Sequence, residues 1–248
     1  MTQRQSRPHR PLATAAAGAT RAAIAWLIVL ALALLSACSG TLLPKPAAPP
    51  ARFTLDDAGL AMAQAAAEPV SRRALASAPV LVVASTRAAP GYDTRRMVYL
   101  RRPQEVEVFA FHEWVDAPAQ MLAPLLVRAL QDSGSFRAVL LAPTAAVGEW
   151  RLETDLIRLQ QDFTDPPSKV RLTLRAVLLD TATRQTIAWR EFDVTVAAAG
   201  DNPTAGAAAA QRATRRTLLA VAAFCAEQAR SLQVVAPRRV PPGEVARP

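Results

Sequence analysis

The chain has 248 residues, of which 51% are hydrophobic and 20% charged, and 29 Lys and Arg against 20 Asp and Glu give a formal net charge of +9. This composition is too apolar for a disordered polymer and too charged for a protein with many membrane spans. Two Cys and two His argue against a disulfide-rich scaffold and a multi-ligand metal centre, and nine Gly leave little room for a glycine-rich nucleotide loop. We therefore expect no metal and no cofactor.

The N-terminal segment, residues 1–37, has the layout of a secretory signal peptide. Residues 1–21 contain four Arg and no Asp or Glu, and residues 22–37 form one apolar run. A positive segment followed by a short apolar run is typical of an exported protein, and this run is shorter than the roughly 20 residues that span a bilayer as a helix. The alternatives are a signal anchor with a chance Cys and a mitochondrial transit peptide.

The apolar run ends in Leu35-Ser36-Ala37-Cys38, which resembles the lipobox of bacterial lipoproteins. We expect signal cleavage before Cys38 and lipid attachment to its thiol. One acyl chain anchors a protein only weakly, so a diacylglyceryl group plus an N-linked chain such as palmitate would provide a stable anchor without a spanning helix. Ser39 replaces the Asp that commonly retains Gram-negative lipoproteins in the inner membrane, which favours the outer membrane and a domain facing the periplasm.

Three segments follow the signal peptide. Residues 38–50 are predicted to be a lipidated Pro- and Ala-rich tether, residues 51–231 a folded domain, and residues 232–248 a flexible Pro- and Arg-rich tail. Much of the positive charge lies in the end segments. A nucleic-acid-binding domain keeps such charge on its fold, so we expect no nucleic-acid partner.

Within the domain, the two-residue period of strands and the 3.6-residue period of helices alternate. The expected strands, in chain order, are residues 52–55, 80–83, 97–100, 106–109, 136–141, 150–163, 170–178 and 187–196. Shifts in the alternation predict one bulge near Ile157 and another between Trp189 and Phe192. The Ala-rich residues 60–78 fit either a weak helix or a loop.

Two main helices are expected. The first has Asp116 as N-cap and Pro118 in its first turn, and it ends at Ser133-Gly134. The second covers residues 204–230, and its predicted apolar face consists of Leu218, Leu219, Ala222 and Cys225, the last as a buried free thiol. Two helices packed against a mostly antiparallel sheet define an α+β fold.

No residue stands out as catalytic. His112 is the candidate general base. The sequence lacks the second His of a zinc-binding His-Glu-x-x-His helix, and it has neither the Gly-x-Ser-x-Gly motif of a serine hydrolase nor a phosphate-binding loop. A periplasmic hydrolase therefore fits the sequence poorly.

Five residues are candidates for partner binding: Tyr92, Arg95, Tyr99, Gln160 and Gln161. Tyr and Arg are common interface anchors, although the two Tyr would also serve to cover a sheet face. The Gln pair is expected on a strand edge, where it would bond a partner strand or remain solvated.

The order of these segments behind the lipobox resembles the ABC-type transport auxiliary lipoproteins, the PqiC-like proteins that accompany MCE-domain lipid transporters. The resemblance covers about residues 51–231 and rests on Gly91–Tyr99, Trp114–Pro118, Leu156–Phe163 and Leu178–Asp180. It implies a non-enzymatic lipoprotein that joins an MCE-domain protein, an ABC permease and an ATPase in moving lipids between the two membranes. The resemblance is compatible with a homo-oligomer. The alternative is an outer-membrane assembly lipoprotein that binds a β-barrel or lipopolysaccharide.

Overall fold

The computed structural model describes residues 24–31, 49–56 and 77–235. Cys38, the C-terminal tail and most of the Ala-rich segment 60–78 lie outside the described residues, as does most of the signal peptide. The chain divides into two units, of which the first covers residues 1–48 and the second the remainder.

In the first unit, residues 24–31 form a helix whose side chains are exposed. None of the helices in the described ranges is both long and apolar enough to cross a membrane.

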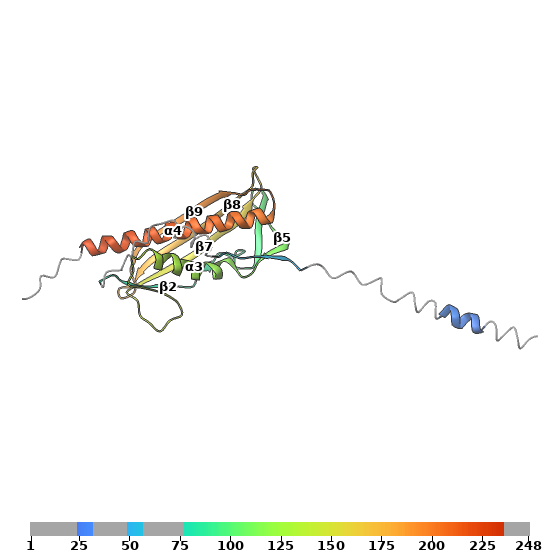
Figure 1. The fold of residues 1–248 in the computed structure, drawn as a ribbon, viewed down its shortest axis with the longest axis horizontal. Coiled ribbons are helices and arrows are strands. Elements are labelled where there is room, and N and C mark those ends of the chain that lie inside the picture. Colours follow the sequence, from blue (N-terminus) through green and yellow to red (C-terminus); the bar gives the residue numbers. More distant parts are fainter. Residues whose placement is uncertain (1–23, 32–48, 57–76, 236–248) are drawn as a thin grey trace, which may run out of the picture. The chain divides into compact units, whose positions relative to one another are not determined.

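In the second unit, the described strands form one sheet built around its three longest members (Figure 1). The strands are β1 (Ala51–Phe53), β2 (Val80–Val83), β3 (Arg87–Ala88), β4 (Arg96–Arg102), β5 (Glu105–Trp114), β6 (Ala138–Leu141), β7 (Trp150–Asp162), β8 (Lys169–Asp180) and β9 (Thr186–Ala197). Antiparallel β7, β8 and β9 pair along their whole lengths. The other side of β7 is shared, in order along the strand, by β2, β3 and β4. Beyond these, β6 pairs with β2, and β5 and then β1 pair with β4.

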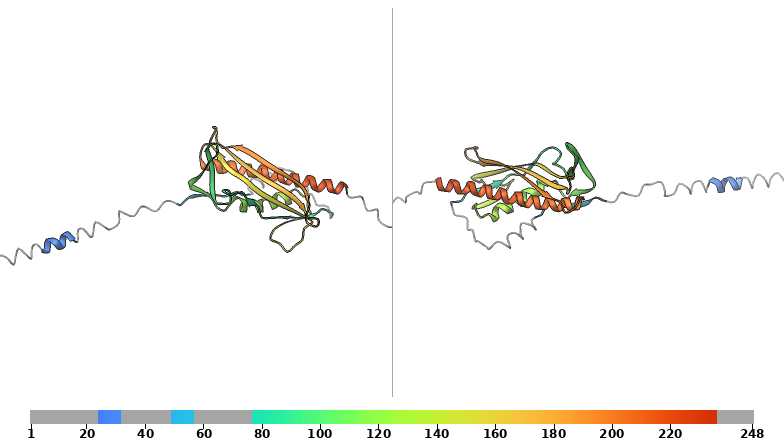
Figure 2. Two further views of the ribbon diagram at one scale, coloured as in Figure 1. Left: turned by 180° about the vertical axis from the view of Figure 1, so that it is seen from behind. Right: turned by 90° about the horizontal axis from the view of Figure 1, so that it is seen from above.

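Two helices, α3 (Pro118–Asp132) and α4 (Pro203–Val235), cover one face of this sheet (Figure 2). Alternate residues of the long strands point to that face, and the side chains that they bury there include Leu152, Leu156, Leu172, Leu174 and Leu178, all fully enclosed. The predicted α+β fold, with a mostly antiparallel sheet packed against two main helices, is confirmed.

The opposite face of the sheet is polar and carries cross-strand ion pairs. Arg171 pairs with Asp193, and Arg175 pairs with Glu191 at 3.1 Å. These side chains are partly exposed, so each pair adds little stability. Together they make this face of the sheet charged and hydrated.

Each expected strand is present, but β3 was not predicted, β5 extends to Trp114 beyond the expected residues 106–109, and one expected bulge is wrong. The bulge near Ile157 is confirmed by a register shift between Leu156 and Arg158. The bulge expected between Trp189 and Phe192 is wrong, because β9 stays in step with β8 there and shifts only at Ile187. Trp189 is out of phase with Phe192 because its side chain points to the polar face and is 63% exposed.

The helix predictions need two corrections. The N-cap of α3 is Ala117, and no side chain caps the helix. Asp116 instead accepts a hydrogen bond from the neighbouring Ala117 N–H at 2.7 Å. In α4, Leu219 is 44% exposed, whereas Leu218 is buried. Neighbouring residues in a helix point about 100° apart, so Leu219 turns away from the apolar face.

Candidate partner-binding surfaces

The predicted partner-binding residues meet where β4 pairs with β7. Val98 lies opposite Gln160, and Tyr99 lies opposite Gln161. The expected edge location of the two Gln is wrong, because β7 carries β4 on one side and β8 on the other. Gln160 and Gln161 are only 7% and 4% exposed.

Gln160 points to the polar face, where the loop before β4 covers it. The Tyr92 hydroxyl donates a hydrogen bond to Gln160 Oε1. Burial raises the pKa of Tyr92, and nearby Arg158 opposes this effect only in part. The hydroxyl therefore stays protonated and acts as a donor. Arg95, in the same loop, is exposed, so Tyr92 and Arg95 are the members of the predicted set that offer surface to a partner.

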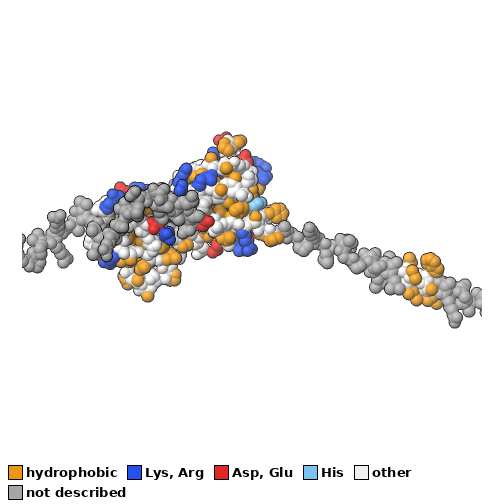
Figure 3. Space-filling view, viewed as in Figure 1, with side chains coloured by type: hydrophobic (Ala, Val, Ile, Leu, Met, Phe, Trp, Pro, Cys, Tyr) orange, Lys and Arg blue, Asp and Glu red, His pale blue; other side chains and the backbone are white. Residues whose placement is uncertain are grey.

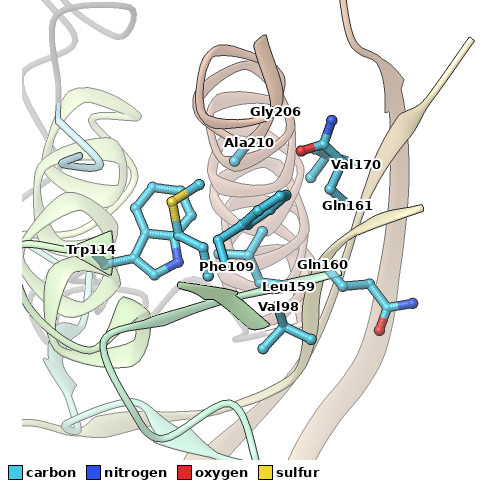
Figure 4. Close-up of a pocket in the computed structure, with 10 residues that line it drawn as sticks. Val98, Phe109, Trp114, Leu159, Gln160, Gln161, Val170, Gly206 and Ala210 are labelled. Atoms are coloured by element: carbon cyan, nitrogen blue, oxygen red, sulfur yellow. The ribbon is translucent and has the colours of Figure 1, made fainter. Parts of the chain in front are cut away.

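Gln161 points to the helices and links β7 to the start of α4 (Figure 4). Its Nε2 donates to Ser168 Oγ at 3.0 Å and to the Asn202 carbonyl at 3.3 Å. Its Oε1 has no hydrogen-bond partner among the described residues. Gln161 lines a cavity of about 10 Å³, which is about the volume needed to hold one water molecule. A partner could reach Gln161 only if α4 moved.

Tyr99 belongs to an aromatic cluster in the β4–β5 hairpin. The ring centroids of Tyr99 and Phe109 are 4.3 Å apart, and those of Tyr99 and Phe163 are 5.8 Å apart. The Tyr99 hydroxyl donates to Glu107 at 2.7 Å, and this bond raises the pKa of Tyr99. His112 packs in the same cluster, 6.0 Å from the Phe109 ring. Tyr99 and His112 thus both serve to build the hairpin.

Around this cluster, the hairpin end, defined as β4, β5 and the turn between them, exposes apolar side chains. Val106 is 60% exposed and Phe111 is 62% exposed. An open groove of about 560 Å³ is lined by residues that include Arg101, Phe109, Phe111 and Phe163. In Figure 3, hydrophobic atoms surround the pale-blue histidine at this end of the domain.

A second exposed surface, which we call the β9 edge, consists of β9 and the adjoining part of α4. Among the described strands, β9 pairs with β8 alone. Trp189 projects from it, and a groove of about 640 Å³ between β9 and α4 includes Arg190, Phe224 and Glu227 in its lining. The Arg190 guanidinium lies 4.8 Å from the centre of the Phe224 ring and 3.8 Å from Glu227. No sequence motif predicts this surface, although the phase shift at Trp189 is consistent with a side chain that points away from the core.

The titratable groups elsewhere in the described residues form no cluster with an evident catalytic geometry. In the described ranges, no group of three or more His, Cys, Asp or Glu side chains could hold a metal ion. Cys225 is a buried free thiol, as predicted. Burial raises its pKa to about 12, so the thiol stays protonated and unreactive.

A helix-covered sheet with two exposed apolar surfaces is an arrangement suited to contact with a partner. The model of the ABC-type transport auxiliary lipoprotein component family matches residues 59–222. The chain belongs to this family, so the resemblance seen in the sequence is confirmed. No curated protein matches the chain.

Solved structures share the fold. The chain is similar to the protein XCC0632 from Xanthomonas campestris, with 23% identity, a TM-score of 0.59, and coverage of 76% of this chain and 98% of that one. It is also similar to an uncharacterized protein, with 12% identity, a TM-score of 0.54, and coverage of 72% and 99%. At these identities, the likeness establishes the fold alone.

Proposed function

We propose that this protein is the non-enzymatic, membrane-anchored auxiliary component of an MCE-type ABC lipid transport system that works between the inner and outer membranes. Family membership supports the lipoprotein and transport roles. The Leu35–Cys38 tetrapeptide supports acylation of Cys38, and Ser39 supports an outer-membrane location facing the periplasm. The proposed partners are an MCE-domain protein, an ABC permease and its ATPase.

The observation that carries the docking role is the β9 edge. An edge strand presents unpaired backbone groups to which an extended segment of another protein can add as a further strand. Trp189 supplies a large anchor of the kind that dominates binding energy at interfaces. We assign this surface to the MCE-domain protein, with Tyr92, on the same face of the sheet, as an additional contact.

The position of the β9 edge fits a partner that comes from the opposite membrane. Trp189 pairs with Val177, which lies opposite Glu153 near the start of β7. The hairpin end pairs with Asp162 at the other end of β7. At about 3.3 Å per residue, the two surfaces are roughly 30 Å apart. β1, where the tether joins the domain, pairs with β5 in the hairpin end. Trp189 therefore lies at the other end of the domain from this junction.

A photo-crosslinking amino acid in place of Trp189, introduced in the native host, tests this assignment. We expect a crosslinked product that mass spectrometry identifies as the MCE-domain protein. The matched control is the same substitution at Val106, which is similarly exposed but lies at the other end of the domain. A product with a β-barrel protein, or equal products at both positions, would contradict the assignment and favour the assembly lipoprotein.

A further inference from the structure

The hairpin end carries apolar side chains on both of its faces. Val106 and Val108 pair with Leu100 and Val98, so they share one face, while Phe111 lines the groove on the other side. The last pair between β4 and β7 is Leu100 with Asp162, so the hairpin tip projects past the end of β7. Val106, Val108 and Phe111 lie along β5, which among the described strands pairs with β4 and β1 and not with β7. Their exposed apolar side chains together mark a contact surface.

Unpaired basic residues surround these apolar side chains. Arg102 forms an ion pair with Glu105 at 2.8 Å. Arg95, Arg96 and Arg101 form no ion pair with any carboxylate in the described part of the chain. The Arg101 guanidinium lies 5.2 Å from the centre of the Tyr99 ring. Aromatic and aliphatic side chains beside free arginines are the composition of surfaces that bind anionic lipid headgroups.

The tether joins the domain at this same place. Ala51, at the start of β1, pairs with His112 in β5. The segment from Cys38 to Ala51 spans at most about 40 Å, even when it is extended at ~3.1 Å per residue. Acyl chains on Cys38 would therefore hold the hairpin end within about 40 Å of the bilayer.

We infer that the hairpin end binds the anionic lipid surface of the membrane that holds the anchor. Val106, Val108 and Phe111 enter the headgroup region, and the free arginines meet lipid phosphates. The contact turns the β9 edge away from that membrane. The inference rests on the proposed acylation of Cys38 but is independent of the identity of the protein partner.

The test uses the acylated protein in vesicles of phosphatidylethanolamine and phosphatidylglycerol with brominated acyl chains, which quench tryptophan fluorescence at short range. Phe111→Trp is compared with Val147→Trp, because Val147 is 85% exposed and lies just before β7, at the end away from the hairpin. We expect the fluorescence added by Phe111→Trp to be quenched and that added by Val147→Trp to persist. Val106→Trp is a second reporter in case Phe111→Trp does not fold.

A variant that lacks three arginine charges tests whether the hairpin end binds anionic lipid headgroups. Arg95→Gln, Arg96→Gln and Arg101→Gln, combined with Phe111→Trp, should lose most of the quenching in these anionic vesicles. In phosphatidylcholine vesicles, Phe111→Trp alone should be quenched less than in the anionic ones.

Four results would overturn the inference. They are equal quenching at residues 111 and 147, no quenching at residues 106 and 111, unchanged quenching in the arginine variant, and a mature protein without acyl chains. An unquenched hairpin that crosslinks to a second copy would assign this surface to self-association instead. The protein partner is read separately, through the Trp189 crosslink, so failure here leaves that proposal standing.

Discussion

At the scale of single residues, burial and pairing decide which side chains build the domain. Trp114 and Trp150 are buried, because large apolar side chains within a periodic pattern seldom face water. The two Gln were misplaced at an edge, because a strand becomes central only through distant partners. The sequence of β7 does not reveal that β4 and β8 pair on its two sides.

Gly206 shows how close the contact between β7 and α4 is. A Cβ at this position would overlap the buried amide group of Gln161. We expect Gly206→Ala to lower the free energy of unfolding by about 1–2 kcal/mol, because the overlap outweighs the roughly 1 kcal/mol that Ala gains over Gly in a helix. Urea unfolding measures this change.

Gly200→Ala is the control for this substitution. Its Cβ would come 3.1 Å from the Asn202 side-chain nitrogen. Asn202 is exposed, so a shift of a few tenths of an ångström in this side chain relieves the contact, while its Oδ1 accepts a hydrogen bond from Ala205 N–H at 2.9 Å. The free energy of unfolding of the Gly200→Ala variant should therefore change little. Equal losses in the two variants would show that the packing of Gln161 against α4 is not the cause.

Cys225 gives a prediction about pH. Because burial raises its pKa to about 12, the native thiol should not react with Ellman's reagent at pH 8 and should react once the protein is unfolded. Above about pH 9 only the unfolded chain loses this proton, so the contribution of Cys225 to stability declines as the pH rises toward 12. A native thiol that reacts as fast as the unfolded one would contradict its burial.

At the scale of elements, the helices and long strands were predictable because their periodic patterns continue over many residues. The stripe of α3 and the alternation of β7 and β8 appear directly in the sequence. The phase shift at Trp189 predicts a bulge that β9 does not have at this point, because a shifted phase fits either an extra residue or a side chain exposed to solvent. Sequence alone does not show that Trp189 faces outward from an edge strand.

The packing of α3 gives a prediction about stability. Leu126 is fully buried, so Leu126→Asp places an unpaired charge in the core and should cost more than about 4 kcal/mol, enough to unfold most of the protein. The exposed neighbour Gln120 provides the control Gln120→Asp, which should fold normally. Circular dichroism melting curves distinguish them, and a normal transition for Leu126→Asp would show that α3 does not pack as described.

At the scale of the whole molecule, the hairpin end pairs with the end of β7, whereas Trp189 on the β9 edge lies level with its start. The hairpin end lies where the tether joins the domain, and the β9 edge lies on the far side. The order of segments identified the family from sequence, but neither surface was located in advance. Exposure of Trp189 and Phe111 results from long-range packing that leaves them outside the core.

Anchoring makes a prediction for the full chain. Cys38→Ser removes the thiol that would accept lipid, so we expect the signal segment to stay uncleaved and no acyl chains to be attached. Mass spectrometry of the purified protein measures both changes. Normal processing of Cys38→Ser would contradict the lipobox, and Cys225→Ser, whose thiol is buried, should be processed as the unmodified chain is.

Co-purification of the tagged protein from its native host in a mild detergent tests the transport role most directly. The account predicts recovery of an MCE-domain protein together with an ABC permease and an ATPase, and loss of all three in a Trp189→Ser variant that still folds. Recovery of a β-barrel protein alone, with no MCE-domain protein, would contradict it.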